Sequence, residues 1–300
     1  MTLSGRLCKY VIVASRRLHL DHLIPDKAFL SMYYRWDFDR PLNWKNPTKY
    51  SEKLQWLKLY DRQPIYSLLV DKYDVKAHVA EIIGEAYLIP TLGVWDRWED
   101  VDFGSLPEQF VLKCTSDSGS AVIVKDRAGF DPSVCPSSLA RSMRTNFYWD
   151  SREWPYRSLR PRLIAEPYIT DSRSGELIDY KFFCFDGCCK AMFVATGRQS
   201  GDVRFDFYDR EFNHLDMEDK HLNAAVPPAK PENYGRMVEI AERLSEGFPH
   251  VRIDLYNVAG KIYFGEYTFY HWSGFDHFKP ASWDDTFGSW LDLGKVRRTR

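Results

Sequence analysis

The sequence predicts an α+β protein in which helices and antiparallel hairpins alternate along the chain. Two hairpins give the clearest evidence. Residues 179–195 carry Asp186-Gly187 between two apolar runs, and residues 251–274 are rich in Val, Ile, Tyr and Phe around a turn at 258–260. Apolar residues with helical spacing lie between them, most clearly from 231 to 247. This interleaving favours a mixed fold.

The remaining elements are expected in order along the chain. Residues 1–70 are mainly helical, and Thr48 or Ser51 caps a helix there. A second helix is expected from Asp71 to Ile83, with Gly84 as its stop. Residues 131–160 read as a helix followed by an irregular connector. Further strands are expected at 87–95, 109–115, 120–126 and 162–169.

Composition and charge exclude several classes of protein. The 300 residues contain 41 Lys plus Arg and 42 Asp plus Glu, a net charge of -1, whereas nucleic-acid binders usually carry a basic excess. Six cysteines form no C-x-x-C pair, so zinc-site spacing is missing. The apolar run at 11–14 is too short for a signal or a membrane span. We therefore expect a soluble, cytoplasmic chain with peripheral membrane contact at most.

The second hairpin carries charged residues in register. Arg252 and Asp254 share one face of its first strand, and Glu266 and Thr268 share one face of its second. Two carboxylates on one face form a hard oxygen site suited to Mg²⁺. The two pairs face the same way only if the turn has an odd number of residues, such as 258–260. The hairpin alone favours a plainer reading, a solvated face with an Arg252–Glu266 ion pair.

Charged residues earlier in the chain favour the functional reading. Lys72 opens a predicted helix, Lys113 and Lys125 end predicted strands, and Glu166 ends another. Taken singly, a lysine at the end of a strand usually extends into solvent, and Glu166 could simply cap a loop. Their order, however, matches that of a known family.

The chain resembles the ATP-grasp superfamily and, within it, the teichuronopeptide-biosynthesis (TupA-like) family, from about Leu23 to about Leu293. The segments that carry the resemblance are NPTKYSEKLQWLKLYD, VDKYDVKAHVAEIIGEAYLIP, LPEQFVLK, RLIAEPYI, DYKFFCFDG, VRIDLY and IYFGEYTFYHWSG. The resemblance implies an ATP-grasp fold, with a helical segment at 1–70, an N-terminal lobe at 71–165 and a C-terminal lobe at 166–300. ATP would lie between the two lobes.

The resemblance also implies a nucleotide site. Lys72 and Lys113 match lysines that contact the phosphates, and Ser118, Gly119 and Ser120 match the loop that covers them. Other residues match the adenine hinge or the ribose side of the site, namely Glu166, Tyr168, Ile169, Asp179 and Lys181.

The same resemblance implies catalytic and metal-binding roles on the second hairpin. Arg252, together with Lys113, matches groups near the transferred phosphate. Asp254 and Glu266 match carboxylates that hold Mg²⁺, and Thr268 stands where many members have an Asn ligand.

Two departures from the family pattern are visible. Asp117 lies in the phosphate-covering loop, where an acid repels phosphates unless it points away or meets a cation. Residues 1–70 also show no Rossmann-like pattern, although such a domain usually comes first in these enzymes.

The implied function is an ATP-dependent carboxylate–amine ligase that acts through an acyl phosphate. Its substrates would be a uronic acid or other carboxylated sugar of a cell-surface polysaccharide, and an amine or amino acid. Three alternatives remain open: a kinase on the same fold, a non-catalytic nucleotide-binding protein, and a glycosyltransferase. The glycosyltransferase would use a D-x-D motif, which fits the pairs Asp37/Asp39 and Asp100/Asp102.

Overall fold

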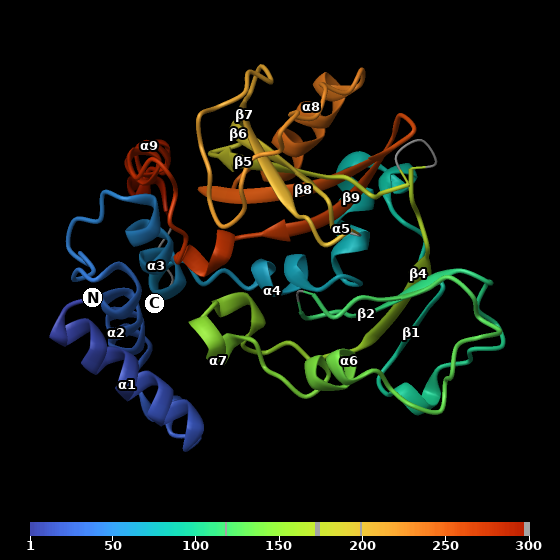
Figure 1. The fold of residues 1–300 in the computed structure, drawn as a ribbon, viewed down its shortest axis with the longest axis horizontal. Coiled ribbons are helices and arrows are strands. Elements are labelled where there is room, and N and C mark those ends of the chain that lie inside the picture. The colour runs from blue at the N-terminus through green and yellow to red at the C-terminus, as the bar shows by residue number, and fades with distance from the viewer. Residues whose placement is uncertain (118, 172–174, 199, 297–300) are drawn as a thin grey trace.

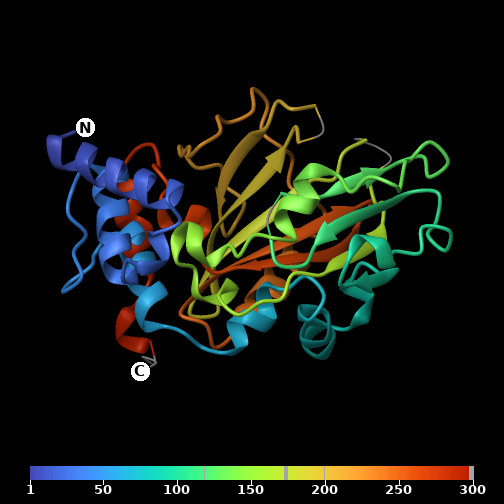
Figure 2. The same ribbon diagram turned by 90° about the horizontal axis from the view of Figure 1, so that it is seen from below.

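The α+β prediction is confirmed by the computed structural model, which describes residues 1–117, 119–171, 175–198 and 200–296 (Figure 1). Its strands form two antiparallel sheets, one of four strands and one of five. Helices α1 to α3 gather with α9 at one end of the molecule, and both sheets lie beyond them (Figures 1 and 2). No described helix is long and apolar enough to cross a membrane.

The N-terminal part is helical, as the sequence predicts. It contains α1 (Leu3–Arg17), η1 (Asp21–Leu23), α2 (Asp26–Phe38), α3 (Tyr50–Tyr60) and α4 (Ile65–Val70). The predicted cap of α3 at Thr48 or Ser51 is wrong, because the cap residue is Lys49. The carboxylate of Glu52 accepts hydrogen bonds from the N–H groups of Thr48 and Lys49, and Asp284 accepts one from the N–H of Ser51 in the first turn.

The next helix, α5 (Val75–Ile83), begins later than the predicted Asp71. The carboxylate of Asp71 accepts hydrogen bonds from the N–H groups of Tyr73 and Asp74, at 2.9 and 3.0 Å, and holds these residues in a turn. The predicted stop at Gly84 is confirmed. Gly84 has φ 99°, a value that glycine adopts without strain.

The four-stranded sheet has the order β1-β4-β2-β3. Its strands are β1 (Gly93–Trp95), β2 (Phe110–Cys114), β3 (Val122–Val124) and β4 (Leu163–Pro167), which confirm the predicted strands with shorter bounds. The short η2 (Glu85–Tyr87) precedes β1. Other short elements connect the strands: η3 (Trp98–Asp100), α6 (Ser137–Ser142), α7 (Tyr148–Ser151) and η4 (Trp154–Tyr156). Phe110, Leu112 and Leu163 are buried in a core of this sheet's own.

The five-stranded sheet has the order β7-β6-β5-β8-β9. Its strands are β5 (Asp179–Phe185), β6 (Cys188–Thr196), β7 (Arg204–Asp209), β8 (His250–Val258) and β9 (Lys261–Thr268). Asp186 and Gly187 form the predicted turn between β5 and β6. The predicted helix at 231–247 is α8 (Tyr234–Ser245), which buries its apolar side in the core of this sheet. Then follow η5 (His271–Gly274), α9 (Ser282–Trp290) and η6 (Leu293–Lys295).

The β8–β9 hairpin reaches its register in an unexpected way. Val258 pairs with Lys261, so the turn has two residues, and the predicted three-residue turn is wrong. Such a turn alone would place Glu266 opposite Ile253, on the face away from Asp254. Gly265 is an extra residue at the register shift, and this β-bulge returns Glu266 to a position opposite Asp254.

After β9 the backbone makes a strained turn. Trp272, Ser273 and Gly274 have φ values of 45°, 57° and 67°, and left-handed conformations are uncommon for residues other than glycine. Helix α3 supports this turn, because Gln55 Nε2 donates to the carbonyl oxygens of Ser273 and Gly274 at 3.0 Å each. A Cβ at Gly274 would lie 2.8 Å from Leu54 Cβ, so the close approach of α3 requires glycine there.

Lys58 of α3 fixes the same turn from a fully buried position. Its ammonium group donates to the carbonyl oxygens of Ser273 and Ser151, both at 2.8 Å, and to Gln55 Oε1 at 3.0 Å. Burial lowers the pKa of Lys58 to about 7. One side chain therefore joins the N-terminal helices to α7 and η5.

Lys58→Met is expected to lower the free energy of unfolding by about 3 kcal/mol, because three buried acceptors lose their donor. The loss should grow as the pH rises above 7. The folded lysine releases its proton near pH 7, whereas the unfolded one keeps it to about pH 10, so unfolding takes up a proton in this window. Urea unfolding at pH 6, 7.5 and 9 measures the difference. A difference that stays constant across this range, with Lys45→Met as the exposed control, contradicts the assignment.

Candidate functional site

A cavity of about 480 Å³ lies between the two sheets. This volume is in the range of small-molecule sites, roughly 300–1,000 Å³. One wall comes from β2, β4 and the loop after β2, and the other comes from β5, β8 and β9. Residues of α7 and η5 also line it.

Most of the candidate residues meet in this cavity, although they come from distant parts of the chain. The predicted residues that line it are Lys72, Lys113, Gly119, Ser120, Glu166, Asp179, Lys181, Arg252, Asp254, Glu266 and Thr268. Tyr168 and Ile169 are described but are not among its lining residues. Ser118 lies outside the described residues.

Arg252 connects the polar groups of β8 and β9. Its Nε and Nη2 donate to the two oxygens of Asp254, at 2.7 and 2.8 Å. Nη2 also lies 3.0 Å from Thr268 Oγ1 and 3.3 Å from Glu266 Oε1. The Arg252–Glu266 pair of the plainer reading therefore exists, but the face is not solvated, since Arg252 is 8% exposed and Asp254 is 1% exposed.

Asp254 is held between two cations. Besides its bonds to Arg252, its Oδ2 accepts a hydrogen bond from Lys181 Nζ of the neighbouring strand β5. Burial acts to raise the pKa of Asp254, but the charges of Arg252 and Lys181 outweigh it and hold the pKa well below its usual range. This carboxylate is therefore an anion at any physiological pH.

Glu166 forms a second group of paired charges on the opposite wall. Its two oxygens accept hydrogen bonds from Lys113 Nζ at 2.7 Å and Lys76 Nζ at 2.5 Å. Burial acts to raise the pKa of Glu166, but the two ammonium groups bring it below its ordinary value. The predicted role of Glu166 in the adenine hinge stays a prediction. Its side chain in this structure is the counter-ion of two lysines.

Asp117 pairs with the cation Lys72. Such a pairing is one of the two ways in which an acid in this loop avoids repelling phosphates. Asp117 Oδ1 lies 3.4 Å from Lys72 Nζ, and Lys72 also donates to the backbone oxygen of Asp117. The side chain of Asp117 is 1% exposed. The acid therefore covers the ammonium group of Lys72 in this structure.

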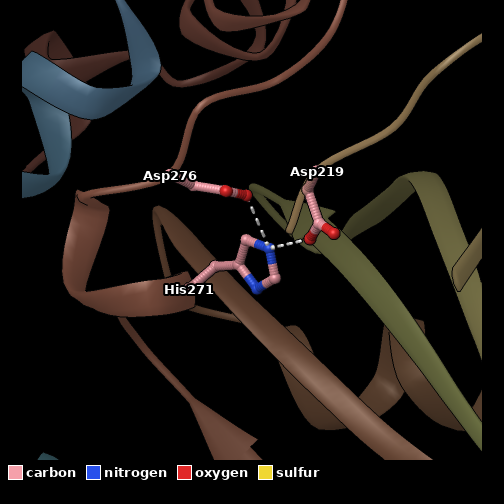
Figure 3. Close-up of side chains that lie close together, drawn as sticks. All are labelled: Asp219, His271 and Asp276. Carbon is pink, nitrogen blue, oxygen red and sulfur yellow. Dashed lines mark ion pairs between the residues drawn. The ribbon is translucent and has the colours of Figure 1, made fainter. Parts of the chain in front are cut away.

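Asp219, His271 and Asp276 form a buried cluster (Figure 3). Arg252 contacts this cluster through His271. His271 Nε2 is 3.4 Å from Asp219 Oδ2 and 3.2 Å from Asp276 Oδ2. On the other side of the ring, Arg252 Nη1 lies 2.7 Å from Nδ1. Because a guanidinium can only donate, Nδ1 accepts this hydrogen bond and the ring proton is on Nε2.

This tautomer decides what the cluster can hold. The three ligand atoms lie within 4.8 Å of one another, a spacing that could also suit a metal ion. A cation at Nε2 would have to replace the ring proton beside the guanidinium of Arg252, which its positive charge opposes. At Nε2 the cluster therefore favours a proton over a metal ion, and this proton lies near Asp219 and Asp276, although neither Nε2 nor Asp276 Oδ2 has a hydrogen-bond partner among the described residues.

Trp272 stands at the edge of the cavity and is 37% exposed. Its Nε1 donates to Asp219 Oδ2 at 3.1 Å, and Lys220 Nζ lies 4.1 Å from the centre of its ring. The exposed, oriented indole and the adjacent ammonium group can contact a sugar ring and an acidic substituent.

Several functional candidates were not predicted from the sequence. Lys76 shares Glu166 with Lys113, and its position four residues after Lys72 was the available signal. No local pattern indicates that Asp219 and Asp276 meet His271. The four acids of the D-x-D pairs do not line the cavity; among them, Asp37 contacts His277, Asp39 contacts Thr2 and Asp100 contacts Arg97.

Comparison with solved structures finds distant likenesses. A D-alanine–D-alanine ligase from Bacillus anthracis complexed with ATP shares 15% identity, with a TM-score of 0.39, and the match covers 67% of this chain and 55% of that one. The ATP-grasp ligase PsnB, complexed with a phosphomimetic variant of its minimal precursor, Mg and ADP, shares 13% identity, with a TM-score of 0.41 and coverage of 82% and 67%. This chain thus spans only about half the length of the D-alanine ligase, and at these scores the likenesses carry no argument about activity.

No curated protein sequence matches the chain. The family model described as TupA-like ATPgrasp, by contrast, matches residues 52–292, which include both sheets and every lining residue of the cavity. The chain belongs to the TupA-like ATP-grasp family and has the ATP-grasp fold.

Proposed function

We propose that this protein is an ATP-dependent ligase that joins a carboxylate to an amine through an acyl phosphate. The observation that carries the proposal is the convergence of Lys72, Lys113, Arg252, Asp254 and Glu266 on one cavity in a chain of this family. Their charges suit a triphosphate and its metal ion.

The reaction needs little covalent chemistry from the protein. A carboxylate oxygen attacks the γ-phosphorus of ATP and ADP leaves, which gives an acyl phosphate. The amine then attacks the acyl carbon, the C–O bond to phosphate breaks, and phosphate and a proton are released. Positioning and charge neutralisation supply most of the rate enhancement for such a transfer.

The residues of the cavity fit ATP as the substrate. Lys113 and Lys76 on one wall and Lys72 beside the covering loop present three ammonium groups. Each is paired with Glu166 or Asp117, so binding of phosphates exchanges one anionic partner for another. Arg252, between Asp254 and His271, would donate to the oxygens of the transferred phosphoryl group.

The donor set also fits Mg²⁺, which prefers carboxylate and hydroxyl oxygens and keeps several waters. Glu266, Thr268 and Asp254 would hold it, and when bound it neutralises charge between the β- and γ-phosphates. The carboxylate of Glu266 is more accessible than that of Asp254, since the two side chains are 38% and 2% exposed. Asp254 would have to release Lys181 or one of its bonds to Arg252.

We further propose a carboxylated sugar of a cell-surface polysaccharide as the acyl donor and an amine or amino acid as the acceptor, in the cytoplasm. The family resemblance and the partly exposed indole of Trp272 support the sugar. The six cysteines are free thiols, as is usual in a reducing compartment.

Phosphate release distinguishes ligase from kinase. With ATP, a uronic acid and an amine, the ligase should form ADP and free phosphate in equal amounts, and hydroxylamine in place of the amine should give a hydroxamate. A kinase would form ADP while the phosphate stays on the product. ADP formation without free phosphate or hydroxamate, across a panel of uronic acids, contradicts the ligase proposal.

The metal role of Glu266 is tested by Glu266→Gln, a half-exposed position at which the fold should survive. The affinity for a non-hydrolysable ATP analogue, measured by calorimetry, should fall at least about tenfold with Mg²⁺ and little without it. Glu239→Gln is a matched control, because Glu239 is exposed on α8 and pairs with Arg236 at the surface. Unchanged Mg²⁺-dependent binding in Glu266→Gln contradicts the metal role.

His271 is expected to position Arg252 through Nδ1 rather than contact the substrate. His271→Asn keeps an acceptor near Nδ1, whereas His271→Leu removes it. We expect kcat to fall about 100-fold in the Leu variant and about tenfold or less in the Asn variant, with the affinity for nucleotide nearly unchanged in both. Thermal unfolding confirms that each variant is folded. Equal losses of kcat in two folded variants contradict the positioning role.

A further inference from the structure

The outward face of α1 lies outside the cavity and has no part in the proposed function. Three large apolar side chains of α1 stand on it in contact with solvent, together with the C-cap residue: Leu3, Leu7, Tyr10 and the cap Leu18, which are 85%, 63%, 72% and 65% exposed. Neighbouring residues add Met1, Val11, Leu20 and Leu23. Single exposed apolar residues are ordinary, but this concentration on one helix is not.

The helix cannot turn this face inward, because its other side is fixed. Gly5 and Ile12 are the buried residues of α1, and a Cβ at Gly5 would lie 3.3 Å from the backbone oxygen of Arg35 in α2. Residues 3, 7, 10 and 18 follow the helical repeat on the side opposite Gly5 and Ile12. The apolar face is therefore presented outward by the packing of α1 on α2.

The charge of this segment differs from that of the whole chain. Residues 1–20 contain no Asp or Glu, whereas the complete chain has a net charge of -1. Arg6, Lys9 and Arg17 are exposed on α1, and Arg16 folds back over the rings of Phe29 and Tyr33. Arg6 and Arg17 lie beside the apolar face, whereas Lys9 lies nearer the buried side, over the ring of Trp36, and Asp39 binds Thr2 at the N-terminal end of α1. An apolar helix face with two exposed arginines beside it complements a surface that is apolar inside and anionic outside.

We propose that α1 is an interfacial anchor that binds the surface of an anionic lipid bilayer. A helix of this kind lies in the plane of the headgroups and inserts its apolar side chains roughly 5–10 Å, while its basic groups meet the lipid phosphates. The 15 residues of α1 are too few to span a bilayer but enough to lie on one. The outward face of a single helix also offers no groove for a peptide.

The anchor would orient the rest of the molecule. α1 lies at the end of the molecule (Figures 1 and 2), and Arg16 Nη2 donates to the backbone oxygen of Asp150 in α7, a helix that lines the cavity. α7 is thus the cavity wall connected to the anchor. This inference does not depend on the ligase chemistry, because no residue of α1 lines the cavity.

The test is flotation of the full chain with lipid vesicles. We expect binding to vesicles of 70% phosphatidylcholine and 30% phosphatidylglycerol, weak binding to pure phosphatidylcholine, and loss of binding at high salt. Leu3→Ser/Leu7→Ser should lower the partition coefficient by about tenfold or more. Arg6→Gln/Arg17→Gln should lower it about 25-fold on anionic vesicles, since each basic group near such a surface contributes a factor of about five.

Matched controls lie on strands β6 and β9 and in the loop between β7 and α8. Leu222→Ser/Val226→Ser removes two side chains that are 56% and 83% exposed, and Lys190→Gln/Lys261→Gln removes two exposed lysines. Both should bind vesicles as the parent does. Light scattering without lipid should show that the state of association is the same for the parent and Leu3→Ser/Leu7→Ser. A dimer that this variant dissociates, or vesicle binding that neither α1 variant reduces, overturns the proposal.

Discussion

The buried pair of Arg252 and Asp254 is the constraint around which the cavity is built. A buried guanidinium and carboxylate are stable only when all their hydrogen-bonding groups find partners. Arg252 therefore reaches Thr268, Glu266 and His271, and Asp254 reaches Lys181. Strands β5, β8 and β9 and the turn after β9 must all be in register for this to happen. The side chains that pair with Arg252 and Asp254 also line the cavity.

Much of the fold could be predicted because it depends on local patterns. A few adjacent residues indicate the hairpin of β5 and β6, in which Asp186-Gly187 separates two apolar runs, and the end of α5 at Gly84. The bulge at Gly265 was missed, although a glycine inside a strand often marks one, because the same residue can also mark a bend or a close approach of another backbone. The cap of α3 was misassigned for a related reason: Glu52 supplies the acceptor from inside the helix, so Thr48 and Ser51 are not needed.

Residues of the candidate site were predicted only where they belong to segments whose order along the chain matches the family. Arg252, Asp254 and Lys113 lie at the cavity as expected. The partners of His271 come from a loop and from the segment after η5, and neither has a pattern that marks it. Lys58 was missed because a lysine within an amphipathic helix normally faces water, and only the tertiary structure shows its three carbonyl acceptors.

The pairing of Glu166 with Lys76 and Lys113 makes this carboxylate an internal competitor for any anion that enters the cavity. An attached competitor acts at a high effective concentration, so a weak monovalent anion such as chloride or acetate cannot displace it. The triphosphate of the proposed function would displace it, because a triphosphate meets several cations at once. Under that proposal the cavity would select anions by their valence, before any contact with the rest of the nucleotide.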